Sequence, residues 1–179
     1  MSEPLLEIKN LVTGFETESG LLKAVDGVSF TVPKGTCVGI VGESGCGKSV
    51  TAMSIVRLLP QPMGKILDGK ILFKGRDLVQ AKETDMHGIR GRHIGVIFQE
   101  PMTSLNPVFR IGAQIDEVIE LHEGAHKTKE EVKARTIEML ETVGIANSEG
   151  VYMMYPHELS GGMRQRVMIA MALACNPKI

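Results

Sequence analysis

Residues 42–49 read G-E-S-G-C-G-K-S and decide how the rest of the chain is interpreted. They follow an apolar run, C-V-G-I-V, at Cys37–Val41, and they lead into a helix-like segment at Val50–Leu59. A strand, a glycine-rich loop, a Lys-Ser pair and a helix, in this order, are the pattern of a phosphate-binding loop. The sequence therefore predicts a strand at Cys37–Val41, a helix at Val50–Leu59 and an anion site between them.

The residue types in this loop suit the phosphates of a nucleotide. Glycine lets successive backbone N–H groups turn towards an anion, and the N-terminus of a helix adds a partial positive charge. Lys48 would reach the β- and γ-phosphates and assist their chemistry, and the Ser49 hydroxyl would bind Mg²⁺. The predicted nucleotide contacts are Gly42, Glu43, Ser44, Gly45, Cys46, Gly47, Lys48, Ser49 and Val50. A glycine-rich turn that binds nothing is disfavoured, because the pattern is complete and lies in its proper context.

Composition sets broader limits. The 179 residues, 43% of them hydrophobic, are enough for one domain with a real core. A net charge of −1 gives no reason to expect nucleic acid as a partner. The longest apolar run, Val167–Cys175, is too short to span a bilayer, and no signal-peptide pattern opens the chain. The three cysteines suit a reducing compartment, with Cys37 and Cys175 as small core residues. We expect a soluble, cytosolic protein.

Around the loop, the pattern changes from strands to helices. Leu5–Val12, Val28–Val32 and Lys70–Phe73 read as strands, separated by polar turns and by a Pro- and Gly-rich loop at residues 60–69. Two strands joined by a short connection ahead of the nucleotide loop suggest a small antiparallel sheet.

The apolar run His93–Phe98 has the length of a strand buried on both faces, and it ends at Gln99. A polar residue at that end of a strand lies where α/β folds place ligand contacts. From this run alone, a Gln that merely ends the strand and faces water is an equally good interpretation.

The C-terminal half carries helical periodicity. Lys82–Ile89 reads as a short helix, and Thr128–Glu131 forms a capping box. Two apolar stripes are more typical of packing faces than of ligand sites. They consist of Ile111, Ile115, Val118, Ile119 and His122, and of Val132, Thr136, Met139, Leu140 and Val143.

A second informative motif, L-S-G-G-M-R-Q, occupies Leu159–Gln165. Ser160 is a good N-cap for a buried helix over Gly161–Ala174. A hydroxyl and two glycine amides at a helix start form another place for an anion. Alone, the motif usually means only a cap; it gains meaning because it follows a phosphate loop.

Taken together, these motifs resemble those of the nucleotide-binding subunits of ATP-binding-cassette (ABC) transporters. G-E-S-G-C-G-K-S matches the Walker A motif, Gln99 matches the Q-loop, and L-S-G-G-M-R-Q matches the family signature. Phe15 lies where the family places an aromatic ring that stacks on adenine, although it could equally be a core residue of the first hairpin. The segments F-Q-E-P-M-T-S-L-N-P (98–107) and Y-P-H-E-L-S (155–160) resemble the dipeptide and oligopeptide importer branch.

The resemblance implies an α/β fold: a P-loop NTPase (ABC ATPase) core with an antiparallel β subdomain and an inserted helical subdomain, incomplete at the C-terminus. Residues 1–100 would form the nucleotide-binding portion, 101–158 the helical subdomain, and 159–179 the signature with its helix. ATP and Mg²⁺ are the implied cofactors, with Ser49 and Gln99 on the metal and with Gln99 and Lys48 as catalytic residues.

The resemblance also implies partners. Two ABC ATPase subunits would pair head to tail, as a homodimer or a heterodimer. The signature residues Ser160, Gly161, Gly162 and Gln165 would then contact the ATP held by the other subunit. Integral membrane permease subunits would bind near Met102–Arg110. The protein would lie in the cytoplasm, peripheral to the inner face of the cell membrane.

One family motif is missing from the sequence. No apolar run that ends in Asp-Glu, the Walker B pattern, occurs in these 179 residues, and the five histidines all precede its expected place. We therefore expect a truncated, hydrolysis-deficient subunit that self-associates through exposed strand edges. The alternatives are a nucleotide-binding or assembly fragment without activity, and a non-transport ABC ATPase. A GTPase is disfavoured, since no N-K-x-D motif is present.

Overall fold

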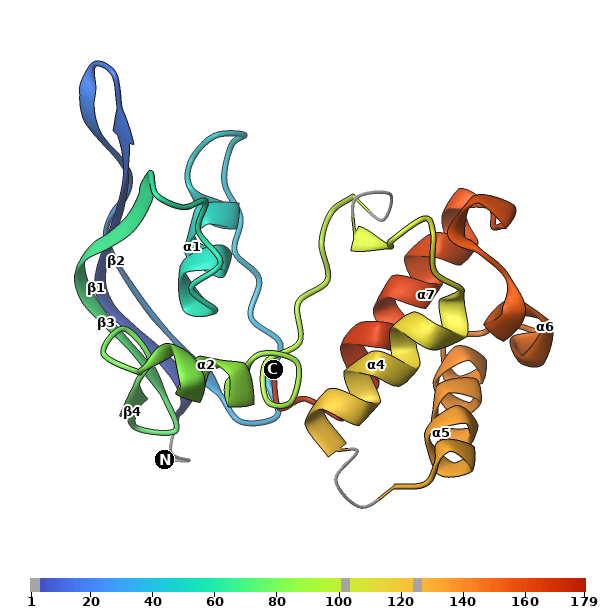
Figure 1. Cartoon of the computed structure of the whole chain (residues 1–179). Helices are drawn as coiled ribbons and strands as arrows, with labels where there is room; N and C mark the ends of the chain where they lie inside the picture. The colour runs from blue at the N-terminus through green and yellow to red at the C-terminus, as the bar shows by residue number, and fades with distance from the viewer. Residues whose placement is uncertain (1–3, 101–103, 124–126) are drawn as a thin grey trace. The chain divides into compact units, whose positions relative to one another are not determined.

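The computed structural model describes residues 4–100, 104–123 and 127–179. The chain divides into two compact units, Met1–Met86 and His87–Ile179. The first is based on an antiparallel sheet and the second on packed helices (Figure 1). Elements that begin in the first unit are β1 (Pro4–Thr17), β2 (Gly20–Pro33), α1 (Lys48–Ile55), β3 (Gly64–Phe73), β4 (Arg76–Asp77) and α2 (Glu83–Ile89).

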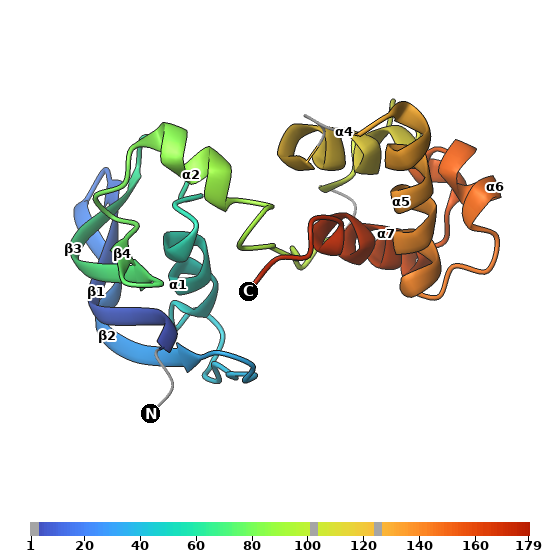
Figure 2. The same cartoon turned by 90° about the horizontal axis from the view of Figure 1, so that it is seen from below.

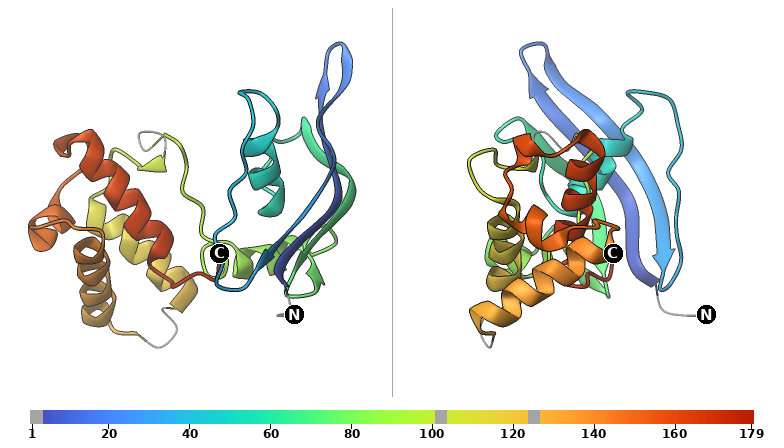
Figure 3. Two further views of the ribbon diagram at one scale, coloured as in Figure 1. Left: turned by 180° about the vertical axis from the view of Figure 1, so that it is seen from behind. Right: turned by 90° about the vertical axis from the view of Figure 1, so that its right-hand side faces the viewer.

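The sheet has the strand order β2-β1-β3-β4, and all of its pairings are antiparallel. β1 and β2 form a long hairpin closed by Glu18 and Ser19, and the strands run side by side in both views of Figure 3. The predicted antiparallel sheet is confirmed, but its strands are longer than predicted. The ladder between β1 and β3 continues to the pair Phe15↔Gly64, so part of the expected loop at residues 60–69 is strand.

α1 packs against the hairpin. The hydroxyls of Thr13 on β1 and Ser54 on α1, both buried, lie 2.9 Å apart in a hydrogen bond. The helix ends at Ile55, four residues before the predicted end at Leu59. The reason is Arg57, which adopts the left-handed conformation with φ 55°.

The Arg57 turn has the hydrogen bonds of a Schellman motif. The N–H groups of Arg57 and Leu58 donate to the carbonyls of Ser54 (3.1 Å) and Met53 (2.9 Å). Glycine usually occupies this position because it adopts positive φ without strain. The Arg57 guanidinium instead holds the turn, since it donates to the carbonyls of Leu78 and Ala81.

Two predicted strands are absent from the structure, so these predictions are wrong. Cys37–Val41 has no regular structure, and Cys37, which we expected in the core, is exposed together with Val38, Ile40 and Val41. His93–Phe98 forms only an isolated bridge, Arg90↔Ile94. Strand propensity yields a strand only where a neighbour completes the hydrogen-bond ladder. Within the described residues, neither run is paired with a strand in this way.

Gln99 therefore does not end a regular strand. It lies in a bend on an exposed segment, so that part of its prediction is wrong.

In the second unit the helices lie close together (Figure 2). They pack around one apolar core. Its elements are α4 (Ile111–Glu123), α5 (Lys129–Thr142), α6 (Ser148–Met153), the 3-10 helix η2 (Pro156–Glu158) and α7 (Gly161–Leu173). The core consists of Leu105, Ile111, Ile115, Ile119, Val132, Met139, Leu140, Ile145, Val151, Leu159, Val167, Ala170, Ala174 and Cys175. Both predicted apolar stripes supply this core, so their interpretation as packing faces is confirmed.

The predicted helix starts are also present. The Thr128 hydroxyl accepts from the Glu131 N–H at 3.2 Å, while the Glu131 carboxylate accepts from the Thr128 N–H at 2.7 Å. Ser160 caps α7 by accepting from the Met163 N–H at 3.3 Å. Among the described residues, no helix combines the length and apolar character needed to cross a membrane.

Candidate functional site

The loop before α1 closes around the side chain of Lys48. The Lys48 ammonium donates to the carbonyl oxygens of Gly42 at 2.8 Å and Glu43 at 2.6 Å, and it lies 3.6 Å from the Cys46 sulfur. Lys48 is also the first residue of α1, and the amides of the first turn have no partner inside the helix. The backbone of the predicted loop thus curves around the Lys48 ammonium, and most residues of the loop are exposed.

Two glycines allow the loop of residues 42–49 to take this conformation. Gly45 and Gly47 have φ values of 85° and 89°, which side-chain-bearing residues adopt only with strain. Gly47 also lies close to β2: a Cβ there would be 2.3 Å from the Ala24 carbonyl oxygen. The register between β1 and β2 shifts beside Ala24, so an irregularity in the hairpin is what brings this carbonyl to the loop.

The loop has the donors that a polyphosphate needs. The first turn of α1 leaves amides of Lys48, Ser49 and Val50 without partners inside the helix, and Ser49 is exposed. Magnesium usually takes one or two protein ligands and completes its shell with phosphate oxygens and water. The exposed Ser49 hydroxyl is suited to be one such protein ligand. In the described ranges, no three His, Cys, Asp or Glu side chains gather as a separate metal site.

Phe15 lies on β1, opposite Leu22 on β2 and Gly64 on β3. A Cβ on Gly64 would be 3.0 Å from the Phe15 ring, so the ring lies over this glycine and is partly buried. Phe15 also lies two residues along β1 from Thr13, whose partner Val25 flanks Gly47. Its predicted stacking on adenine stays a prediction.

The other predicted site residues belong to the second unit. Gln99 is exposed. Gly161 and Gly162 open α7 beside the Ser160 hydroxyl, and a Cβ on either glycine would meet nothing within 4 Å. Gln165 is exposed and lies one turn after Gly161 on the same helix face. The signature residues therefore form an open helix start, accessible to a ligand carried by another molecule.

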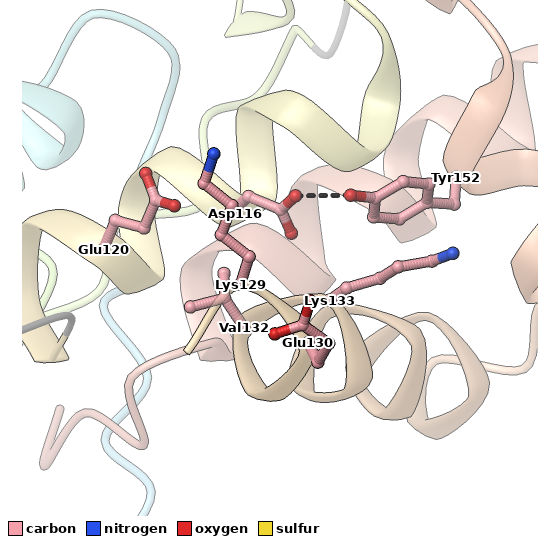
Figure 4. Close-up of a pocket in the computed structure, with 7 residues that line it drawn as sticks. All are labelled: Asp116, Glu120, Lys129, Glu130, Val132, Lys133 and Tyr152. Carbon is pink, nitrogen blue, oxygen red and sulfur yellow. Dashed lines mark hydrogen bonds between the residues drawn. The ribbon is translucent and has the colours of Figure 1, made fainter. Parts of the chain in front are cut away.

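A polar pocket of about 370 Å³ lies on the helical unit (Figure 4). The Asp116 carboxylate on α4 accepts from the hydroxyls of Thr136 on α5 and Tyr152 on α6, each at 2.5 Å. The Lys133 ammonium lies 5.3 Å from the centre of the Tyr152 ring. Burial, followed by the hydrogen bond to Asp116 and the negative charge of Asp116, raises the pKa of Tyr152 to about 12.

Sequence reasoning missed the polar residues that fix the helical unit. Gln114 and Asp116 lie among the apolar residues of α4, and both bond to other segments. The available signal was a polar residue on an otherwise buried helix face, because such a residue needs a defined partner. The irregularity at Ala24 had no comparable signal, since strand register depends on the complete ladder.

Comparison with known proteins places these features in context. The model of the ABC transporter family matches residues 25–179. The oligopeptide transport ATP-binding protein OppD of Bacillus subtilis is 53% identical over 98% of this chain and 48% of its own length. The dipeptide transport ATP-binding protein DppD of Bacillus subtilis is 48% identical over 99% of this chain and 52% of its own length.

A solved structure shares the fold. It is the dimeric, post-hydrolysis state of the ATP-binding cassette MJ0796 bound to ADP and Pi, with a TM-score of 0.85. The match, at 27% identity, covers 96% of this chain and 70% of that one. The predicted α/β fold with an antiparallel sheet and a helical part is confirmed. The chain spans about half the length of the curated relatives it matches.

We predict that Gly47→Ala destabilises the protein more than Gly45→Ala. Both alanines would carry the strain of positive φ, about 1–2 kcal/mol. Only the alanine at 47 would collide with the Ala24 carbonyl, because a Cβ at 45 meets nothing within 4 Å. The extra loss of unfolding free energy should exceed about 1 kcal/mol in urea titrations followed by circular dichroism. Equal losses would contradict the close approach of Gly47 to β2.

Alkaline pH should weaken the helical unit through Tyr152. Its folded-state pKa, about 12, lies above the ordinary value of 10.0, so its stabilisation is complete below pH 10 and is lost as pH rises towards 12. The thermal midpoint should fall across this window, and it should fall less in Tyr152→Phe. Tyr155→Phe serves as the matched control and should follow the wild-type curve. A Tyr152→Phe protein with an unchanged pH dependence would contradict the bond to Asp116.

Proposed function

We propose that this chain, which belongs to the ABC transporter family, forms part of the ATP-binding, energy-coupling subunit of a peptide importer. The single observation that carries the nucleotide site is the position of Lys48. Its ammonium group lies inside the loop of residues 42–49, bonded to the Gly42 and Glu43 carbonyls at the start of α1. A lysine in a glycine-rich loop at a helix N-terminus, where the first amides have no partner inside the helix, suits an anion.

In this proposal, the phosphates of ATP replace the carbonyl groups as partners of Lys48. The amides of residues 45–50 would bind the phosphate oxygens, and the phosphate charge would be neutralised by Lys48 and by Mg²⁺ on the Ser49 hydroxyl. Gln99 would complete the metal site. Phe15 would stack on adenine. ADP and phosphate in the MJ0796 structure support ATP as the nucleotide.

The exposed helix start of α7 supports pairing with a second subunit. Ser160, Gly161, Gly162 and Gln165 would contact the γ-phosphate of ATP held by that subunit. The MJ0796 structure is described as dimeric, which favours this arrangement. The second subunit would be either an identical copy or a paralogue. This chain has one loop and one signature, and each would meet its counterpart on a second subunit of either kind.

Peptides are proposed as the cargo because OppD and DppD carry oligopeptide and dipeptide transport in their names. Integral membrane permease subunits would bind the surface near Asn106–Arg110, on the cytoplasmic side of the membrane. The predicted contact region was Met102–Arg110, of which Met102 and Thr103 lie outside the described residues. A net charge of −1 gives no support to a nucleic-acid function.

We further propose that these 179 residues bind ATP but hydrolyse it poorly by themselves. The sequence contains no apolar run ending in Asp-Glu to hold Mg²⁺ and to orient the attacking water. The remaining groups, Lys48 and Gln99, would bind and position the nucleotide without a carboxylate base.

The nucleotide site is tested by calorimetric titration with Mg-ATP. Lys48→Ala should weaken binding by roughly tenfold to a hundredfold, which corresponds to the loss of a charged hydrogen bond. Lys34→Ala removes an exposed lysine ahead of the loop and should leave the affinity unchanged. Circular dichroism checks that both variants are folded. Equal affinity in wild-type and Lys48→Ala proteins would overturn the proposal.

The hydrolysis proposal has its own measurement. In a phosphate-release assay under saturating Mg-ATP, the wild-type chain should be indistinguishable from Lys48→Ala, although the wild type binds nucleotide. Steady turnover by the wild type that Lys48→Ala abolishes would contradict the expected deficiency. Such turnover would at the same time support the proposed ATP site, because it would depend on Lys48.

A further inference from the structure

Two buried hydroxyls connect the sheet to the helix that begins at the candidate nucleotide site. Thr13 on β1 and Ser54 on α1 have no exposed surface, and their side-chain oxygens lie 2.9 Å apart. The Ser54 hydroxyl donates to the Val50 carbonyl at 2.7 Å. A serine hydroxyl has one hydrogen, so the Thr13 hydroxyl is the donor in the bond between the two side chains. These bonds therefore lead from β1, through Ser54, to the first turn of α1.

The buried residues of α1 itself are Thr51 and Ser54, both of them polar. The Thr51 hydroxyl donates to the Gly47 carbonyl at 3.0 Å, whereas the Ser54 hydroxyl also reaches across to β1. Buried hydroxyls need hydrogen-bond partners, and the bond between Thr13 and Ser54 exists at only one separation of strand and helix. An apolar contact at this point would tolerate sliding of the helix on the sheet.

The strand and the helix joined in this way carry the two ends of the proposed nucleotide site. α1 begins at Lys48, whose first turn would bind the phosphates. Phe15 lies two residues after Thr13 on β1, so the two side chains lie on the same face of the strand. The Phe15 ring is fixed beside β3, because a Cβ on Gly64 would lie 3.0 Å from it. The distance from this ring to the first turn of α1 therefore depends on the bond of Thr13.

We propose that Thr13 is a positioning residue, whose bond to Ser54 sets the spacing between the Phe15 ring and the phosphate-binding turn of α1. This inference rests on the proposed function, in which Phe15 stacks on adenine. A ring stacks well only within a narrow range of positions, and one nucleotide must reach both ends of the site at once. Thr13 is fully buried, so it acts through the strand and not by touching the nucleotide. It would favour a whole adenine nucleotide over a bare polyphosphate, which uses only the phosphate end.

The test compares the affinities of Mg-ATP and Mg-tripolyphosphate in calorimetric titrations of the full chain. Thr13→Val keeps the shape of the side chain and removes its hydroxyl. Its ATP affinity should fall about fivefold, the typical effect of one lost hydrogen bond. Its tripolyphosphate affinity should stay within a factor of about two of wild type. Thr13→Ser retains the hydroxyl and should restore the ATP affinity, which a role in packing alone would not require.

Two further variants separate positioning from general stability. Ile8→Val removes one methylene from a buried residue of the same strand; it should lower the thermal midpoint and leave the ratio of the two affinities unchanged. Ser54→Ala removes the acceptor on α1 and should shift this ratio in the same direction as Thr13→Val. Ser54→Ala therefore serves as the test if Thr13→Val does not fold.

A double variant shows whether Thr13 acts through Phe15. Phe15→Ala should weaken ATP binding by about tenfold, through the loss of base stacking, and should leave tripolyphosphate binding unchanged. Adding Thr13→Val to Phe15→Ala should weaken ATP binding no further, because the ring that Thr13 positions is then absent. Independent effects would instead multiply.

The outcomes distinguish this inference from the proposed function. If Thr13→Val binds ATP as tightly as wild type, or loses ATP and tripolyphosphate affinity equally, the positioning role is wrong while the nucleotide site stands. Multiplying effects in the double variant would also contradict the positioning role. If Phe15→Ala binds ATP as tightly as wild type, the proposed stacking is wrong and this inference falls with it. If wild type binds neither ligand, the nucleotide site itself is wrong.

Discussion

The enclosure of the Lys48 ammonium by its own loop is the interaction on which the proposed nucleotide site depends. The loop can close only because glycine occupies positions with positive φ and because Gly47 has no side chain to collide with the Ala24 carbonyl. That carbonyl is in turn placed by a shifted register in the β1–β2 hairpin. Sheet geometry, loop conformation and the position of one positive charge are therefore linked.

The helical unit solves a different problem, which is how to hold several short helices in one arrangement. Apolar burial supplies most of the driving force but does not by itself fix orientation. Asp116 joins α4 to α5 and α6 through two hydroxyls, while Gln114 joins α4 to a surface loop. Gln114 is buried and Asp116 is half-buried, and their hydrogen bonds are satisfied only in one arrangement, so they specify it. The start of α7 and the loop of residues 106–109 therefore have defined positions within the helical unit.

Local chemistry was readable from the sequence, whereas long-range pairing was not. The glycine-rich turn before α1, the capping box at Thr128 and the apolar stripes of the helices depend on residues close together in the chain, and they are present as predicted. Phosphate binding at that turn stays a prediction. The strands expected at residues 37–41 and 93–98 were not found, because a strand needs a partner that local propensity cannot supply. Arg57 shows the same limit: its left-handed turn depends on carbonyls more than twenty residues away.

The most direct measurement is a crystal structure of this chain with Mg²⁺ and a non-hydrolysable ATP analogue. We expect the β-phosphate to lie within hydrogen-bond distance of amides between Gly45 and Ser49, with the Lys48 ammonium moved from the Glu43 carbonyl onto phosphate oxygen. A nucleotide whose phosphates contact none of these amides, or that binds while Lys48 stays on the carbonyls, would contradict the proposed site.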